Sequence, residues 1–444
     1  MRQASLHRIE LDVPPDAFVL ARGLVERPGL AVLASTAPSP LYGAYSFILA
    51  DPTGEVRELD PLCGARAAGA GPWGFVPWFV GLLPYEAERA RLERPSWTRP
   101  DTRPAPRLSQ RQWRCYDGVI VIDHRLGEVF ALAETAGRAR DLAAAARRAV
   151  EAPTFDALTV RARDDEPPAA HVARVRALLE LIKDGELYQA NLARRLAIDL
   201  ENAEPRALLA FFDRLAHAAP TPFAALLRGD DAWAVSTSPE LFLDALPSGS
   251  GESFDWLTTE PIKGTRQRAA DPAADAALRA ALESDPKERA ELAMIVDVER
   301  NDLARVSIPG TVVVDGPPWI EAHHTVFHRV ARVRGHARPE LDRRAVLASM
   351  LPSGSVTGAP KVRAMEVIAA LEPMRRGLYT GAIGTFNRDG SMRLSMAIRT
   401  AVMGDDGKGE YLVGGGIVAD SDPELELAET VWKSKQLARV AGTL

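Results

Sequence analysis

Two pairs of glutamates recur in this chain with the same spacing. Glu288 and Glu291 lie three residues apart, and Glu426 and Glu429 repeat that interval near the C-terminus. On a helix, residues three apart share one face, so both carboxylates of a pair project in the same direction. Magnesium prefers such oxygen ligands. The spacing predicts either a magnesium site between two helices or two solvated helix faces.

A lysine stands in an unusual setting in the stretch "TTEPIKGTR", residues 258–266. Lys263 follows Pro261 and Ile262 and precedes Gly264. Apolar flanks indicate a backbone that runs toward the interior, where lysine is rare unless it is paired. The alternatives are a lysine on a surface turn and an amine held inside a site.

Two glycine-rich segments precede predicted helices. In "GGGIVADSDPE" (414–424), the glycines allow a ligand to approach the backbone, and Ser421 with Glu424 forms a capping box. The start of such a helix favours anions, although a purely structural glycine turn is an equal alternative. The second segment, "LPSGSVTGAPK" (351–361), lacks the P-loop spacing, so nucleotide binding is not expected there.

Histidines and cysteines offer little support for a transition-metal site. His323, His324 and His328 cluster near one predicted strand, but no cysteine or further suitably spaced ligand accompanies them. Packing or hydrogen bonding is their expected role. Cys63 and Cys115 are too few for a disulfide framework or a zinc site, and they fit a reducing compartment.

Composition indicates an ordinary globular protein. The 444 residues are 46% hydrophobic and 26% charged, with a net charge of −6. An acidic balance argues against a nucleic-acid groove, and the arginines of residues 99–114 read as a solvated loop. The N-terminal residues lack the apolar core of a signal peptide, and no apolar run of 18 residues occurs. We therefore expect a cytoplasmic protein without a membrane span.

The periodicity of apolar residues mixes helices and strands without a regular alternation. A hairpin is predicted over 117–134, a surface helix over 136–151 and a connector over 152–170. The remaining predicted helices cover 171–186, 285–306, 359–371 and the segment after Ser421; the remaining strands cover 46–52, 74–86, 222–228, 232–237, 241–245, 379–386, 392–399 and 411–414. This order is typical of an α+β fold.

Eight stretches occur together in a characteristic order: "YQANL" (188–192), "SPELF" (238–242), "PIKGTR" (261–266), "KERAELAMIVDVERNDLARV" (287–306), "LPSGSVTGAPKVRAMEVI" (351–368), "YTGAIGTF" (379–386), "AIRT" (397–400) and "GGGIVADSDPELELAET" (414–430). Together they resemble the chorismate-utilising enzymes, a family that includes anthranilate, aminodeoxychorismate, isochorismate and salicylate synthases. The resemblance implies two large antiparallel β-sheets packed face to face, with helices outside. It further implies a catalytic region over 165–440, packed as one unit with an N-terminal region over 1–150 similar to component I of the first two synthases.

The resemblance also assigns roles to individual residues. Lysine at position 263 is typical of aminodeoxychorismate synthases, whereas anthranilate synthases carry alanine there. In that role Lys263 adds covalently at C2 of chorismate, and Glu240 first protonates the leaving hydroxyl and then accepts a proton from ammonia. Gln189 occupies the place of the lysine that activates water in isochorismate synthases, so water addition is not expected. Anthranilate synthase component I is the alternative activity.

The same resemblance implies ligands and partners. Magnesium is assigned to Glu288, Glu291, Glu426 and Glu429. The dianionic substrate is assigned to Gln189, Thr357, Tyr379, Arg399, Gly415, Gly416 and Lys433. His328 is assigned a catalytic place near the C1 carboxylate and the leaving hydroxyl. Ammonia is expected from a separate glutamine amidotransferase subunit. In relatives the N-terminal region holds tryptophan; here "LAST" (33–36) and "AYSFILADP" (44–52) stand at that place, and the sequence leaves open whether tryptophan binds.

Overall fold

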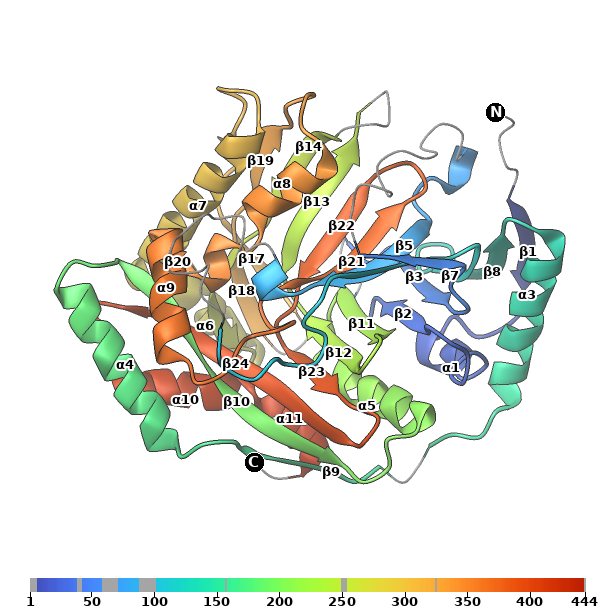
Figure 1. The fold of residues 1–444 in the computed structure, drawn as a ribbon, viewed down its shortest axis with the longest axis horizontal. Helices are drawn as coiled ribbons and strands as arrows, with labels where there is room; N and C mark the ends of the chain where they lie inside the picture. Colours follow the sequence, from blue (N-terminus) through green and yellow to red (C-terminus); the bar gives the residue numbers. More distant parts are fainter. Residues whose placement is uncertain are drawn as a thin grey trace.

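A computed structural model describes residues 6–37, 42–57, 71–87, 101–155, 158–248, 254–323 and 326–442. Within these ranges the strands form two large antiparallel sheets and one small sheet (Figure 1). This architecture is the α+β fold expected from the sequence. No helix among the described residues has the length and apolar character needed to cross a bilayer.

The larger sheet runs through strands from the whole length of the chain. Its spatial order is β1 (His7–Leu11), β8 (Glu128–Ala133), β7 (Gly118–Asp123), β3 (Tyr45–Leu49), β2 (Ala31–Ala34), β11 (Phe223–Arg228), β12 (Trp233–Ser238), β23 (Thr400–Met403), β24 (Lys408–Val418), β10 (Gln189–Leu200) and β20 (Gly358–Ala359), with β9 (Val160–Asp164) paired to β10. Strand β2 pairs directly with β11, so the sheet passes from residues 1–150 into residues 165–440 without a break.

The second large sheet crosses between the same two regions. Its order is β16 (Val313–Val314), β19 (Val333–His336), β14 (Phe254–Thr259), β13 (Leu241–Pro247), β22 (Met392–Met396), β21 (Ala382–Asn387), β5 (Pro77–Leu83), β6 (Gln112–Cys115) and β4 (Gly54–Val56). Here β5 and β21 form the junction. The small sheet contains β15 (Ile262–Gln267), β18 (Val326–Val330) and β17 (Trp319–Ala322).

Helices surround the sheets. The α-helices described are α1 (Ala17–Ala21), α3 (Ala136–Glu151), α4 (Pro168–Lys183), α5 (Pro205–Ala218), α6 (Pro272–Ser284), α7 (Pro286–Val306), α8 (Arg343–Met350), α9 (Lys361–Leu371), α10 (Pro423–Lys433) and α11 (Lys435–Ala441), and η4 (Gly354–Val356) is a short 3₁₀ turn. Thr135 and Asp285 cap the helices α3 and α7 by accepting backbone N–H groups of the first turn. Helix α10 is capped by Asp422 and not by the capping box predicted for Ser421 and Glu424.

Apolar side chains of the two large sheets meet in a shared core. Leu49 and Val121 of the first sheet pack in one buried cluster with Leu82 and Ile383 of the second. Since the inner faces of both sheets are apolar, face-to-face packing removes both from water at once. The predicted face-to-face arrangement is therefore present.

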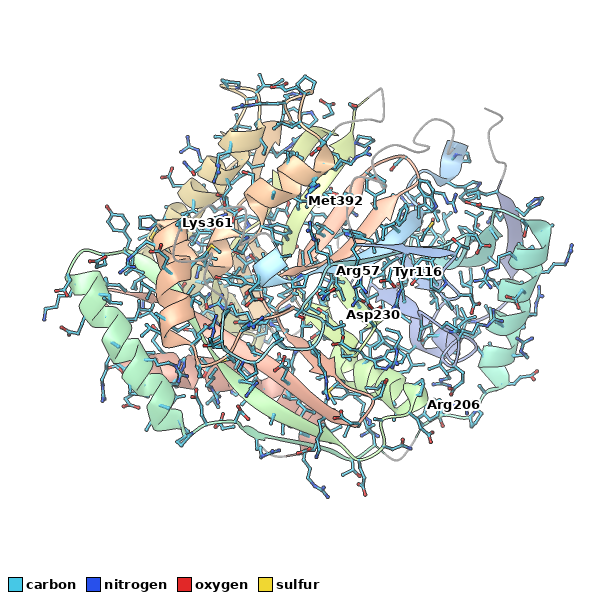
Figure 2. All side chains as sticks on the ribbon, in the orientation of Figure 1. Arg57, Tyr116, Arg206, Asp230, Lys361 and Met392 are labelled. Atoms are coloured by element: carbon cyan, nitrogen blue, oxygen red, sulfur yellow. The ribbon has the colours of Figure 1, made fainter. Side chains whose placement is uncertain are left out.

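The outer faces of the sheets are covered by helices. Leu142 of α3 and Phe212 of α5 pack on the first sheet. Helix α3 lies on the right of Figure 1. On the second sheet, α7 and α8 bury Leu303 and Val346 in the cluster that contains Met392, which Figure 2 labels. Each of these helices has one apolar face, and it packs where that face is covered by a sheet.

Some sequence expectations need correction. The supposed connector over 152–170 contains β9 and the start of α4, and the sequence reading overlooked β10 and α5. Strand β10 is buried along nearly its whole length. Its sequence therefore lacks the alternation of polar and apolar residues that marks a half-exposed strand. The strand predicted over 392–399 ends at Met396, since Arg399 has a left-handed backbone with φ of 50°.

Candidate active site

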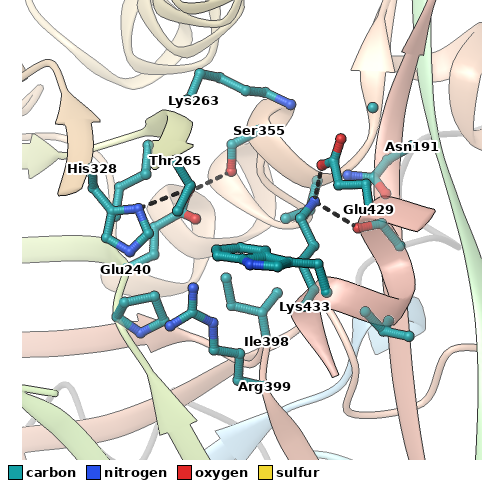
Figure 3. Close-up of a pocket in the computed structure, with 18 of the residues that line it drawn as sticks. Asn191, Glu240, Lys263, Thr265, His328, Ser355, Ile398, Arg399, Glu429 and Lys433 are labelled. Carbon is teal, nitrogen blue, oxygen red and sulfur yellow. Dashed lines mark hydrogen bonds and ion pairs between the residues drawn. The ribbon is translucent and has the colours of Figure 1, made fainter. Parts of the chain in front are cut away.

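A cavity of about 490 Å³ opens where α7 and α10 approach β10, β24 and the small sheet (Figure 3). The residues predicted for the site that line it are Glu240, Lys263, Glu288, Glu291, His328, Tyr379, Arg399, Gly416, Glu426, Glu429 and Lys433. These side chains come from seven separate stretches of sequence. The fold thus brings most of the predicted site together at one cavity.

Three predicted residues lie just outside this lining. Gln189 is fully buried, and its amide nitrogen lies 2.6 Å from the position that a Cβ on Gly416 would take. Thr357 is buried too, and its hydroxyl donates to the Ser353 carbonyl at 2.8 Å. Gly415 lies beside Glu426 and Glu429. They form the layer directly behind the cavity wall.

Lys263 is aimed by an irregularity of its strand. The pairing of β15 with β18 shifts register between Ile262 and Thr265, and Gly264 between them has a φ of 86°. A bulge of this kind redirects the side chains beside it, and glycine tolerates the positive φ. The Lys263 side chain is half-buried and its amine lies 2.9 Å from the Cβ position of Gly416. The structure therefore places the lysine at the cavity wall, against a glycine backbone.

Glu240 lies in a setting that favours its protonated form. Its side chain is buried, and burial is the main reason why its pKa rises to about 7. The Ser355 hydroxyl donates to Oε1 at 2.8 Å and opposes this shift, while the charge of Glu299 adds to it. A carboxyl group with a pKa near neutrality can both donate and accept a proton during turnover.

His328 is held as a neutral imidazole. Burial lowers its pKa well below the usual range, and Arg399 and His323 lower it further. A hydrogen bond of 3.0 Å joins its Nδ1 to the Thr265 hydroxyl, while Nε2 has no partner among the described residues. The ring of His323 lies 5.2 Å from that of His328, and His324 lies outside the described residues. His323 and His328 therefore pack against each other, and His328 hydrogen-bonds to Thr265.

Two cations face the cavity from its lower wall in Figure 3. The Arg399 side chain has no carboxylate partner in the described part of the chain, and burial lowers its pKa. Lys433 contacts the Glu429 carboxylate at 2.6 Å and donates to the Gly414 carbonyl at 2.9 Å. A half-buried guanidinium and ammonium group at one cavity suit a substrate with two carboxylates.

The four glutamates share the cavity wall but are occupied by other partners. Glu288 pairs with Arg266 at 3.0 Å, Glu291 lies 3.9 Å from Lys287, Glu429 pairs with Lys433, and Glu426 accepts from Ser421 at 2.6 Å. Across the described ranges, no three acidic, histidine or cysteine side chains are grouped closely enough to hold a metal ion. In this arrangement the four glutamates therefore do not form a cluster that could hold magnesium.

The donor set nevertheless fits magnesium. Oε2 of Glu426 is buried without a partner among the described residues. Burial is the main cause of the raised pKa of Glu426, and the charge of Glu429 raises this pKa further. Burial likewise raises the pKa of Glu291, with Glu288 and Glu429 adding to the shift. Crowded carboxylates that repel one another are stabilised by a divalent cation. Magnesium would be held by these four residues once the lysine and arginine contacts open.

Sequence reasoning did not assign several residues that shape the site. Ser355 contacts Glu240 and Thr265 contacts His328, while Asn191, Ile398 and Trp432 complete the lining. Ser355 lies in the glycine-serine loop over 351–361, one of the family motifs, from which the resemblance assigns only Thr357 to the site. Its hydroxyl faces a carboxyl group rather than a phosphate.

A second cavity, of about 340 Å³, lies between the two large sheets. Its lining includes Leu33, Ser35 and Tyr45 from the N-terminal strands and Asp244 and Arg393 from the second sheet. The Ser35 hydroxyl is buried without a partner among the described residues. The segments 33–36 and 44–52 contribute to this lining, so a cavity separate from the first lies where the resemblance places the tryptophan pocket of relatives.

Comparison with known proteins identifies the family. The model of the chorismate binding enzyme family matches residues 47–439. The chain is 34% identical to anthranilate synthase component 1 1 of Haloarcula marismortui, over 97% of this chain and 90% of the relative. It is 37% identical to aminodeoxychorismate synthase component 1 of Klebsiella aerogenes, over 72% and 68% of the two chains.

Solved structures show the same fold. Anthranilate synthase component I of Streptococcus pneumoniae superposes with a TM-score of 0.72 at 26% identity, over 90% of this chain and 92% of that chain. The menaquinone-specific isochorismate synthase of Escherichia coli gives 0.73 at 18% identity, over 98% and 95%. The protein belongs to the chorismate-binding enzymes, and chorismate is its substrate class.

Proposed function

We propose that this protein is the chorismate-aminating component of an aminodeoxychorismate synthase, which converts chorismate and ammonia to 4-amino-4-deoxychorismate. The observation that carries the proposal is Lys263, an amine that the β15 bulge places at the wall of the chorismate-family cavity. Anthranilate synthases of this family carry a small residue at that position. A lysine there has no evident use in amination at C2.

The chemistry explains why an amine is useful. Amination at C4 with retention of configuration needs two displacements. The neutral Lys263 amine adds at C2 while the ring double bond shifts and the C4 hydroxyl departs with a proton from Glu240. Ammonia then adds at C4, the double bond shifts back and the lysine leaves, while Glu240 accepts one proton from the incoming nitrogen. Covalent catalysis of this type divides one difficult substitution into two easier ones.

The surrounding groups suit these steps. A carboxyl group with a pKa of about 7 can donate to the departing hydroxyl and later accept a proton. Arg399 and Lys433 would bind the substrate carboxylates, with the backbone of Gly415 and Gly416 beside them. Magnesium, when bound by the four glutamates, supplies positive charge to a substrate carboxylate.

The alternative is amination at C2, which is the activity named for several relatives, among them the anthranilate synthase of Haloarcula marismortui. Those names favour it at a comparable level of identity. The presence of Lys263 at the cavity wall opposes it, because amination at C2 needs no nucleophilic side chain.

Product analysis distinguishes the two activities. The protein is incubated with chorismate, ammonium and magnesium, and the products are separated and identified by mass and absorbance. We expect 4-amino-4-deoxychorismate, which a separate lyase would convert to 4-aminobenzoate. Anthranilate as the main product would refute the proposal and establish the alternative.

Two further ligands follow from the proposal. Ammonia would come from a separate glutamine amidotransferase subunit, as the component names of the relatives suggest. Tryptophan is proposed for the cavity between the large sheets, where Tyr45 and Phe75 stack with ring centroids 4.1 Å apart. Calorimetry with tryptophan would test this site, and a lack of heat at millimolar tryptophan would refute it.

A further inference from the structure

A row of hydroxyl groups leads from Glu240 away from the cavity to a second buried carboxyl group. The Ser355 hydroxyl contacts Glu240 Oε1 at 2.8 Å, and Ser355 Oγ lies 3.0 Å from Ser353 Oγ. The Ser353 hydroxyl donates to Glu299 Oε1 at 2.5 Å. All four side chains are buried, with Glu299 only 1% exposed. The row therefore joins two buried carboxyl groups through two buried hydroxyls.

Three elements bring this row together. Glu240 precedes β13, Ser353 caps the η4 turn, Ser355 lies within that turn, and Glu299 lies on α7. The fit is close, since a Cβ on Gly354 would lie 3.4 Å from Glu299 Oε1 and 2.3 Å from Val298. The turn is thus pressed against α7 at the residue between the two serines. Any larger residue at position 354 would separate them.

The donors and acceptors of the row can be counted. Each serine has one proton to donate, and a deprotonated carboxylate has none. When Glu240 is protonated, it donates to Ser355, which donates to Ser353, which donates to the Glu299 carboxylate. Every hydroxyl in this arrangement has both a donor and an acceptor. When both carboxyl groups are ionised, one contact in the row lacks a proton and two buried charges repel each other.

Other charged groups surround the two ends. Glu240 faces Lys263 of β15 and Arg399 before β23. Glu299 accepts a second hydrogen bond from Thr259 of β14 at 3.0 Å, and it lies near Asp302. Asp302 itself pairs closely with Lys361 of α9, which Figure 2 labels. In the described part of the chain, no cation makes an ion pair with Glu299, so its charge is compensated by hydroxyls alone.

We propose that Glu240 and Glu299 hold one proton in common and exchange it along the hydroxyls of Ser355 and Ser353. In the exchange, the Glu240 proton passes to Ser355 Oγ, the Ser355 proton to Ser353 Oγ, and the Ser353 proton to Glu299 Oε1. No proton is gained or lost by the row. Glu299 acts as a positioning residue, since it reaches the substrate only through Glu240.

The consequence is a Glu240 that keeps a substantial protonated fraction near neutral pH. Repulsion by Glu299 adds to burial in raising the pKa of Glu240 to about 7. The use of the shared proton in catalysis rests on the proposed acid-base role of Glu240 in the amination. The shared proton itself is a property of the protein without substrate.

The test is an infrared titration of the protein without substrate. The stretching band of the protonated Glu240 carboxyl group is assigned by its loss in Glu240→Gln and then followed with pH. In Glu299→Gln, which keeps the shape but removes the charge, we expect the midpoint of this band to fall by about one pH unit or more. An unchanged midpoint would overturn the proposal.

A second variant separates the row of hydroxyls from simple repulsion. Ser353→Ala interrupts the row but leaves the charge of Glu299, and we expect the Glu240 midpoint to fall as well; Ser353→Thr, which restores a hydroxyl, should recover it. If repulsion alone acts, Ser353→Ala keeps the wild-type midpoint, and the exchange along the hydroxyls is refuted. Glu260→Gln is the matched control, because Glu260 is buried but pairs with Arg332, and its loss should leave the midpoint in place.

The outcomes for this inference and for the proposed function are distinct. The infrared midpoint reports the shared proton, whatever the product of the enzyme. Product analysis reports the site of amination, whatever the state of Glu299. In the enzyme assay, Glu299→Gln should also move the alkaline limb of the pH profile to lower pH without a matching change in KM, which a merely structural defect would not produce.

Discussion

At the scale of single residues, we propose that Lys263 separates two chemistries on one fold. Under this proposal, replacement by alanine removes the nucleophile and leaves room for ammonia to approach C2 directly. We expect Lys263→Ala to lower the rate of 4-amino-4-deoxychorismate formation by about 10²-fold or more and to release 2-amino-2-deoxyisochorismate or traces of anthranilate. Mass spectrometry of the wild type without ammonia should show an adduct on the peptide that contains Lys263.

The matched variant is Lys263→Arg, which keeps a positive charge but offers no nucleophilic amine at neutral pH. It should be as inactive in C4 amination as the alanine variant. If Lys263→Ala instead forms 4-amino-4-deoxychorismate at the wild-type rate, and no adduct is trapped, Lys263 is not the nucleophile.

Glu240 is the second residue-scale determinant, and it predicts a pH dependence. Its pKa is raised from the ordinary range of glutamate to about 7, chiefly by burial. The group is therefore protonated below pH 7 and loses its proton as the pH rises through that value. If protonation of the leaving hydroxyl limits the rate, kcat should fall above about pH 7, and a pH-rate profile measures this. A rate that continues to rise to pH 9 would contradict the acid role.

At the scale of elements, α7 and α10 each present a pair of glutamate carboxylates to one cavity. We expect Glu291→Gln and Glu429→Gln to raise the magnesium concentration needed for half-maximal activity by at least about tenfold. Each variant removes one anionic oxygen donor while the helix remains intact. Calorimetric titration of magnesium into the protein without substrate supplies a readout that is independent of turnover.

A control residue is available on the same helix. Glu424 of α10 is 65% exposed at its side chain and lies 3.3 Å from Arg176, away from the cavity lining. Glu424→Gln should leave the magnesium titration unchanged. Unaltered magnesium dependence in both Glu291→Gln and Glu429→Gln would remove the assignment of the metal to these helices.

At the scale of the whole molecule, the two large sheets tie the N-terminal and C-terminal regions together. Strands β2 and β11 pair in one sheet, and β5 and β21 pair in the other. A fragment of residues 165–440 alone would expose the edges of β11 and β21 and the apolar inner faces beside them. We expect it to aggregate or to lack a cooperative thermal transition, as measured by size-exclusion chromatography and circular dichroism.

Co-expression provides the complementary result. If residues 1–150 are supplied as a separate chain, the missing strands can pair again, and solubility should be recovered at least in part. A soluble, cooperatively folding fragment 165–440 would show that the catalytic region is an independent domain, contrary to this expectation.

Local sequence patterns predicted a substantial part of this protein. The helix over 136–151 and the hairpin over 117–134 are present, since their periodicity depends on neighbours within one or two turns of chain. The glutamate pairs and the lysine in "PIKGTR" were found for the same reason. The ordered motifs, through the family resemblance, then linked these residues into one site, and the cavity lining agrees with most of that list.

Only the tertiary structure decided the environment of those residues. Strand β10 and the contact of Ser355 with Glu240, 115 residues apart, have no local periodic pattern, because they depend on burial and on pairing between distant segments. The same holds for the ion pair between Glu288 and Arg266, which lie 22 residues apart on separate elements. A residue type specifies which proton or charge is available, but burial and neighbours set its pKa, and those are created when remote parts of the chain pack together.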